Sequence, residues 1–189
     1  MWDVSIADIL AVLIALVSFI YTWRSNSENK KETDRLNQAQ SDIEATNQYR
    51  HVKTCRTDLM EKMQALIPVI NNENISKEEK KERILSVYTS YLDFYNEIND
   101  YCSLLNHGAF TSDEVLKNTA RDLLIDAADY QCDYYKTFIE LSEMIDEKYL
   151  IKGPNMSRYK EYDKYLQEQL MGNRWPNLVE KRKKTKLIR

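Results

Sequence analysis

Residues 84–105 read ILSVYTSYLDFYNEINDYCSLL, and this stretch decides the fold class. Its apolar and aromatic side chains recur at steps of three and four residues, which is the spacing of one face of an α-helix. We therefore expect a helix that buries this face in a core. The face comprises Ile84, Leu85, Tyr88, Tyr91, Leu92, Tyr95, Ile98, Cys102 and Leu105.

Both ends of this helix carry recognisable signals. Ser76 is followed three residues later by Glu79, the spacing of a capping box, in which each side chain satisfies a backbone N–H at the start of a helix. Gly108 follows the last apolar residue and is the natural stop, because glycine adopts the left-handed conformation that ends many helices. His107 just before it is most simply a residue that caps the helix end.

The pattern continues toward the C-terminus. Residues 111–114, Thr-Ser-Asp-Glu, predict the start of a third helix, and the Lys-Gly-Pro sequence at 152–154 predicts its end. A shorter helix over about 157–171 stops at Gly172. The expected buried face of the third helix comprises Leu116, Ala120, Leu123, Leu124, Ala127, Tyr130, Tyr134, Phe138, Leu141 and Ile145.

Toward the N-terminus, nothing breaks a helix between Arg24 and Leu66, and Pro68 with the Asn-rich run that follows predicts the end. The chain has only three glycines and three prolines in 189 residues, too few for the turns of a sheet. We therefore predict an all-α fold, a bundle of about four helices whose first helix is long.

The N-terminal segment is strongly apolar. Residues 4–23 read VSIADILAVLIALVSFIYTW, with Asp8 as the one charge. A helix of this length rises about 30 Å, the thickness of a bilayer's hydrocarbon layer. Aromatic residues flank it, and the basic residues that follow predict an external N-terminus and a cytoplasmic C-terminal domain. We expect a single transmembrane helix over 1–24, a helical rod over 25–67, a helical bundle over 68–174 and a basic tail over 175–189.

Small and weakly polar residues share one face of this segment. In a membrane such a face would favour helix–helix contact, and Asp8 would turn toward a partner or line a pore. The alternative is a simple anchor with Asp8 reaching the interface. The residues of this predicted packing or pore-lining face are Ser5, Asp8, Ala11, Ala15, Ser18 and Thr22.

Two charged groups of residues are candidate binding sites. An acidic ladder on the third helix is either a solvated face or a docking strip for a basic partner, and it comprises Asp122, Asp126, Asp129 and Asp133. The basic C-terminal residues predict binding to lipid headgroups or to an acidic partner, rather than to nucleic acid, because no interleaved aromatic residues accompany them. These residues are Lys181, Arg182, Lys183, Lys184, Lys186 and Arg189.

Catalysis has little support in the sequence. There are two histidines, His51 and His107, and no nucleotide-binding, zinc-protease or serine-hydrolase motif. The Arg-to-His spacing of ribonucleases of the HEPN class is missing before both histidines. The three cysteines, Cys55, Cys102 and Cys132, are too scattered for a zinc site. We predict no enzyme activity, no metal and no cofactor.

The residues 92–98, Leu-Asp-Phe-Tyr-Asn-Glu-Ile, with Gly108 and the pair Tyr134 and Tyr135, resemble a broad set of bacterial proteins with one N-terminal span and a helical domain. The plan is similar to the small membrane accessory protein of type VI-B CRISPR systems. That resemblance implies an inner-membrane homo-oligomer that acts in antiviral defence, through a pore and with a defence-system protein as partner. The alternative is a membrane-tethered module that recruits a cytosolic protein.

Overall fold

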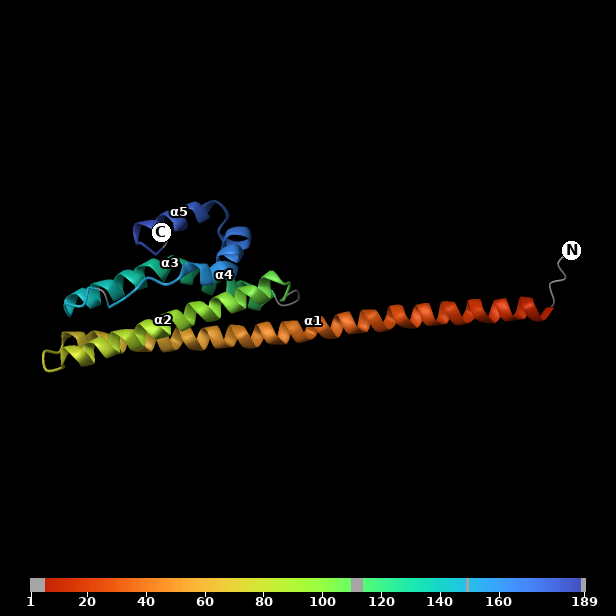
Figure 1. Ribbon diagram of the computed structural model, residues 1–189, viewed down its shortest axis with the longest axis horizontal. Helices are drawn as coiled ribbons and strands as arrows, with labels where there is room; N and C mark the ends of the chain where they lie inside the picture. Colours follow the sequence, from red (N-terminus) through yellow and green to blue (C-terminus); the bar gives the residue numbers. More distant parts are fainter. Residues whose placement is uncertain (1–5, 110–113, 149, 188–189) are drawn as a thin grey trace. The chain divides into compact units, whose positions relative to one another are not determined.

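The computed structural model describes residues 6–109, 114–148 and 150–187, without the side chains of residues 6–14, 17 and 114–117. The all-α prediction is confirmed, since the described residues contain helices and turns and no strand. The longer helices are α1 (Ile6–Asn71), α2 (Lys77–Asn106), α3 (Glu114–Met144) and α5 (Trp175–Lys184), and Figure 1 shows their order. Between α3 and α5 lie η1 (Met156–Tyr159), α4 (Lys160–Tyr165), the π-helical η2 (Leu166–Met171) and η3 (Gly172–Arg174).

The chain divides into two compact units. Unit 1 covers Met1–Ser41 and unit 2 covers Asp42–Arg189, so α1 contributes its first part to one unit and its second part to the other. In its described part, unit 1 consists of helix α1 alone, and its described side chains are almost all exposed. Unit 2 holds the buried core.

The predicted membrane-spanning helix over 1–24 is contradicted. Within the residues that the structure describes, no helix combines the length and the apolar character that crossing a bilayer requires. The inner-membrane location, its orientation and the pore depended on this helix and are corrected with it.

The local end signals of α2 are confirmed. The Ser76 side chain accepts a hydrogen bond from the backbone N–H of Glu79 at 3.2 Å, and α2 begins at Lys77. Gly108 follows the helix with φ of +88°, the left-handed region that favours glycine. The predicted start of α3 at residues 111–113 lies outside the described residues.

Other helix ends differ from the prediction. Helix α1 continues past Pro68 to Asn71, because a proline in the last turn removes only the bond to the carbonyl of Gln64, which lies at the exposed surface. Lys80 of α2 then donates to the Ile70 carbonyl in the last turn of α1, 2.8 Å away. Helix α3 ends at Met144, well before Gly153, in a turn where Asp146 has φ of +55°.

The core of unit 2 is rich in tyrosine. Tyr91 lies at its centre, with its ring 4.8 Å from that of Tyr95 and 5.5 Å from that of Phe138, measured between centroids. Aromatic pairs at such distances add to the free energy that burial of their area provides. The second part of α1 closes this core with buried apolar side chains, which are Ala45, Tyr49, Val52, Leu59, Leu66 and Ile70.

Polar contacts hold the helices of unit 2 in register. Gln48 of α1 donates to the Glu97 carboxylate of α2 at 2.6 Å, and Lys62 of α1 donates to the Ser90 hydroxyl at 2.9 Å. The Asn99 side-chain oxygen accepts from the backbone N–H groups of Glu161 and Tyr162, which places the start of α4 on α2. The prediction of a single short helix over 157–171 is wrong in one respect: the structure has a succession of 3₁₀, α and π turns there.

Candidate functional site

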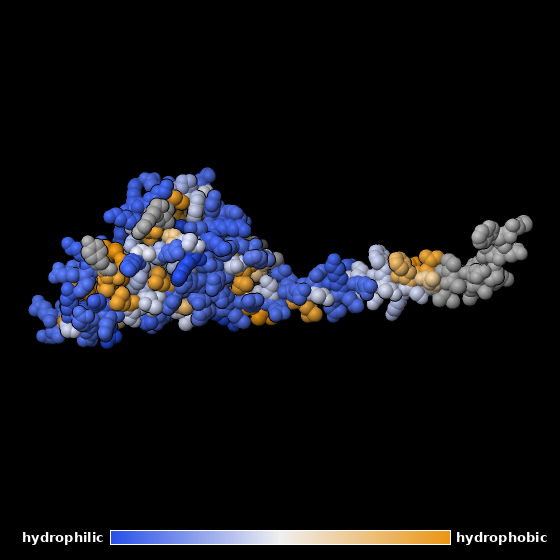
Figure 2. All heavy atoms as spheres, in the orientation of Figure 1, coloured by the Kyte–Doolittle hydropathy of each residue, from blue (hydrophilic) through white to orange (hydrophobic). Residues whose placement is uncertain are grey.

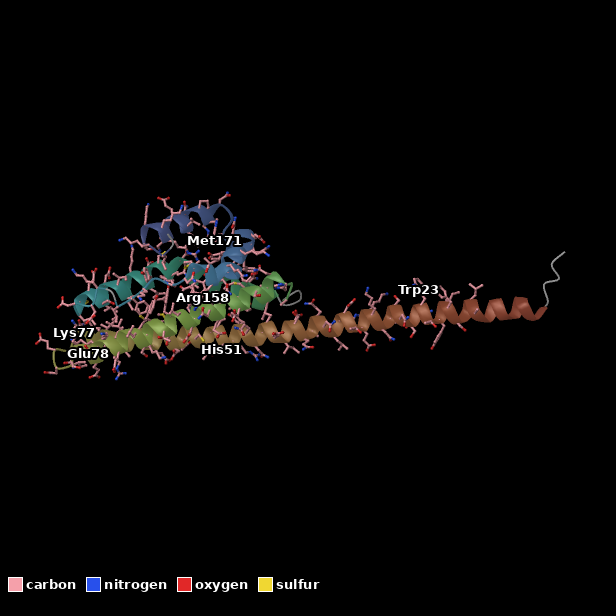
Figure 3. All side chains as sticks on the ribbon, in the orientation of Figure 1. Trp23, His51, Lys77, Glu78, Arg158 and Met171 are labelled. Carbon is pink, nitrogen blue, oxygen red and sulfur yellow. The ribbon has the colours of Figure 1, made fainter. Side chains whose placement is uncertain are left out.

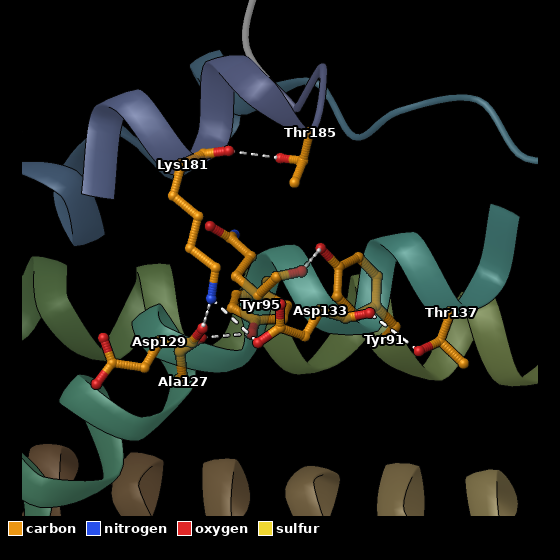
Figure 4. A network of polar contacts seen from close by, with 9 residues as sticks. Tyr91, Tyr95, Ala127, Asp129, Asp133, Thr137, Lys181 and Thr185 are labelled. Carbon is orange, nitrogen blue, oxygen red and sulfur yellow. Dashed lines mark hydrogen bonds and ion pairs between the residues drawn. The ribbon is translucent and has the colours of Figure 1, made fainter. Parts of the chain in front are cut away.

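The acidic ladder lies on the exposed face of α3, as its spacing predicts. Two of its members form ion pairs within the chain. Arg56 of α1 lies 3.4 Å from the Asp126 carboxylate, and Lys181 of α5 lies 3.0 Å from that of Asp133. Lys181 also donates to the backbone carbonyl of Asp129 at 2.8 Å. Figure 4 shows Lys181 reaching from α5 to these two positions of α3. The carboxylates of Asp126 and Asp133 are therefore paired with basic side chains of the same chain.

The basic residues near the C-terminus separate into distinct environments. Helix α5 covers Trp175–Lys184, which is most of the segment predicted as a basic tail. Lys181 contacts α3, Arg182 is buried, and Lys184 forms an exposed ion pair with Glu180 at 2.7 Å. Lys183 and Lys186 line a cleft beside the loop at 153–157. Arg189 lies outside the described residues.

Arg182 is the least expected of these residues, because its side chain is only 1% exposed. Its Nη1 donates to the Asp163 carboxylate at 2.7 Å, and its guanidinium carbon lies 5.7 Å from the centroid of the Trp175 ring. Burial raises the pKa of Asp163 even though the nearby Arg182 lowers it. Within the part of the chain that the structure describes, the Nε and Nη2 atoms of Arg182 have no hydrogen-bond partner. The pair joins α5 to α4 inside the core.

Three tyrosine hydroxyls bind α3 to the helices around it. Tyr95 of α2 donates to the Ala127 carbonyl at 2.7 Å, and Tyr162 of α4 donates to the Leu124 carbonyl at 2.8 Å. Tyr91 contributes a longer bond of 3.5 Å to the next turn of α3, at the carbonyl of residue 131. Figure 4 shows the tyrosines of α2 directed at these carbonyls. Burial raises the pKa of all three phenols well above 10.0, so they stay protonated donors at neutral pH.

His51, His107 and Cys102 lie in separate environments of unit 2. His51, labelled in Figure 3, lies 3.5 Å from the Glu97 carboxylate and is exposed. The Nδ1 of His107 lies 2.6 Å from the carbonyl oxygen of Ser103, so this ring caps the end of α2. Burial raises the pKa of the Cys102 thiol, which makes it a poor nucleophile. Among the described side chains, no group of three or more His, Cys, Asp and Glu could hold a metal ion.

Of the face predicted to pack in a membrane, Ser5, Asp8 and Ala11 lie outside the described side chains, while Ala15, Ser18 and Thr22 are exposed. The Thr22 hydroxyl donates to the Ser18 carbonyl at 2.8 Å, so this pair is satisfied within the helix. The larger apolar side chains beside this face form a continuous exposed cluster, which we call the N-terminal apolar cluster. It comprises Leu16, Phe19, Ile20 and Trp23.

Sequence reasoning did not identify the cleft between residues 153–157, which run into η1, and the end of α5. Its volume is about 810 Å³, within the range of small-molecule sites. The one signal was Gly153, because an added Cβ there would lie 3.1 Å from the Tyr135 hydroxyl. The other walls come from segments that are distant in the sequence, so no local sequence pattern predicts that they meet.

Comparisons of the chain with family models, with curated proteins and with solved structures give no match. The resemblance to single-span bacterial proteins therefore rests on the residues at 92–98, with Gly108 and the aromatic pair of α3, and on the helical plan alone.

Proposed function

We propose that this chain is a non-enzymatic assembly protein that associates with a second copy of itself through the part of α1 in unit 1. The observation that carries this proposal is the N-terminal apolar cluster. Its four side chains are exposed at 52% (Leu16), 69% (Phe19), 57% (Ile20) and 69% (Trp23). Figure 2 shows a hydrophobic patch near the N-terminal end of the described helix, beside a long hydrophilic stretch.

The four side chains form one surface. At 100° per residue they fall within an arc of about 100° on the helix, the width of a face that packs against another element. In its described part, unit 1 offers no second element to cover them. A helix without tertiary contacts is only marginally stable in water, so a partner would stabilise both the helix and the apolar surface. Burying one such side chain contributes about 1.5–3 kcal/mol.

The same helix favours an identical helix as that partner. A row of uncharged residues begins at Phe19 and recurs at alternating steps of three and four, the spacing of a coiled-coil seam; this row lies beside the cluster on the helix and shares only Phe19 with it. Two copies side by side would therefore bring no charges together along this seam, and its asparagines could fix the register. Arg24 and Glu28 lie away from it and pair with each other at 3.1 Å. The seam continues through Thr22, Asn26, Asn29, Thr33 and Leu36.

The test is the molar mass of the full chain by light scattering coupled to size exclusion, at a series of concentrations. We expect a dimer or higher oligomer that Trp23→Ser shifts toward the monomer. Tyr21→Ser is the matched control, because Tyr21 is 75% exposed and lies on the far side of the helix from the cluster. A wild-type chain that stays monomeric, or equal dissociation by both variants, would overturn the proposal.

Absence of catalysis is part of the same proposal. It is supported by the environments of His51 and His107 and by the raised pKa of the Cys102 thiol. A role in antiviral defence has only the resemblance behind it and stays a prediction, as does a defence-system partner.

A further inference from the structure

The cleft at the C-terminal end of unit 2 has cationic and polar walls. Tyr135 of α3 forms one side, residues 153–157 form the second, and Lys183, Lys186 and Leu187 form the third. Figure 1 shows the C-terminal end of α5 lying over α3, where these walls meet. Among the described residues that line the cleft, two carry an ammonium group and none carries a carboxylate. The nearest acidic side chain on α5, Glu180, pairs with Lys184 instead.

Neutral hydrogen-bond donors accompany the two lysines. The Asn155 side-chain oxygen accepts from both the backbone N–H and the hydroxyl of Ser157, at 3.2 Å and 2.7 Å. This orientation leaves the Asn155 amide N–H groups as donors. The Tyr135 hydroxyl makes no hydrogen bond to the described part of the chain, and burial raises its pKa, so it too is a protonated donor. The cleft therefore presents donors and positive charge together.

Lys186 occupies a backbone position that normally belongs to glycine. Its φ is +59°, and the surrounding bonds form the six-to-one and five-to-two pattern that ends many helices. Leu187 donates to the Arg182 carbonyl at 2.9 Å, and Lys186 donates to the Lys183 carbonyl at 3.0 Å. A side chain in this conformation is strained, and strained residues of this kind cluster at functional sites. The strain is explained if the lysine side chain is needed in the cleft.

We propose that this cleft binds a small organic phosphate. Two lysines and neutral donors suit a doubly charged phosphate group, which accepts several hydrogen bonds at once. The rest of the cleft is apolar, with Pro154, Met156 and Leu187 among its walls, so it can take the organic part of the ligand. The volume of about 810 Å³ accommodates a molecule as large as a nucleotide.

The test is isothermal titration of the full chain with adenosine monophosphate, with inorganic phosphate and with adenosine as separate probes. We expect saturable binding of adenosine monophosphate, weaker binding of phosphate and none of adenosine. Binding of phosphate alone, with no gain from the nucleoside, would overturn the organic part of the proposal. No saturable binding of either phosphate probe would overturn the whole.

Lys186→Gly separates binding from folding. Glycine removes the ammonium group and relieves the backbone strain, so we expect binding about tenfold weaker together with a raised melting temperature. Lys183→Gln should also weaken binding. Lys184→Gln is the matched control, because it removes the same charge from the same helix outside the cleft. Equal loss of binding in the control would show general attraction by a basic helix and would refute the site.

Discussion

Raising the pH should unfold unit 2 near pH 11, because six of the tyrosines in its core resist ionisation while they are buried. Burial raises the pKa of every one of them above the ordinary value of 10.0. The pKa of Tyr159 rises to about 12, and the pKa values of the other five are raised at least as clearly. These five are Tyr88, Tyr91, Tyr95, Tyr101 and Tyr162.

The sign of the effect follows from the direction of these shifts. The unfolded chain releases its phenolic protons at pH 10, whereas the folded chain retains them, so stability is complete below pH 10 and is lost as the pH rises toward 12. At pH 11 a tyrosine with a folded pKa of about 12 or more destabilises the fold by about 1.4 kcal/mol. Six such groups amount to about 8 kcal/mol, comparable with the whole stability of a domain.

The assay follows helix content by circular dichroism and tyrosine ionisation by ultraviolet absorbance across the same pH series. We expect helix content to fall in one steep transition, with the buried tyrosines ionising over the same pH range. Tyr159→Phe should restore about 1.4 kcal/mol at pH 11 and change little at neutral pH, because desolvation and nearby charges, with no hydrogen bond, set the pKa of this phenol. Tyr130→Phe is the control, since Tyr130 is 53% exposed.

One result would refute this reasoning. If the six buried tyrosines ionise near pH 10 while the helix content stays intact to pH 12, their hydroxyls reach solvent in the folded chain. The tyrosine core of α2 and α4 would then be open to water, against the burial of Tyr95 and Tyr162.

Two further substitutions test local features of unit 2. Ser76→Ala removes the cap at the start of α2 and should destabilise the fold by about 1 kcal/mol, measured by urea unfolding; no change would mean that the 3.2 Å bond to the Glu79 N–H contributes nothing. Gly153→Ala brings a methyl group within 3.1 Å of the hydroxyl of Tyr135, whose ring is packed in the core, and should cost about 1 kcal/mol in the same measurement. A neutral or stabilising result there would show that the Tyr135 ring gives way freely.

Much of the helical plan was predictable because its signals are local. Ser76 caps α2 through a residue three positions away, and Gly108 ends it through its own φ, so neither depends on the rest of the fold. The periodic faces of α2 and α3 predict burial for residues such as Tyr91 and Leu124, but the same periodicity is wrong for Leu85 and Tyr130, which are exposed. The end of α3 at Met144 was missed, because Asp146 takes the left-handed conformation without a glycine to indicate it.

The N-terminal segment shows that amino-acid composition alone does not predict a membrane span reliably. Its apolar residues predicted a membrane span, whereas the described part of α1 contains no stretch that meets the requirement. The sequence does establish that Leu16, Phe19, Ile20 and Trp23 share one helix face, because that depends only on helical geometry. It does not establish what covers them, since that depends on contacts beyond the helix.

The sequence by itself determined that the chain is helical, where α2 begins and ends, and which residues form an acidic ladder and a basic C-terminal segment. Only the tertiary structure decided what those charges do. Lys181 reaches α3, Arg182 enters the core beside Asp163, and Lys186 lines a cleft, although the three lie within six positions of one another. The physical reason is that helix α5 directs Lys181 and Arg182 about 100° apart, and the left-handed turn after the helix redirects Lys186, so each meets a different part of the fold. These tertiary contacts depend on residues that are far away in the sequence.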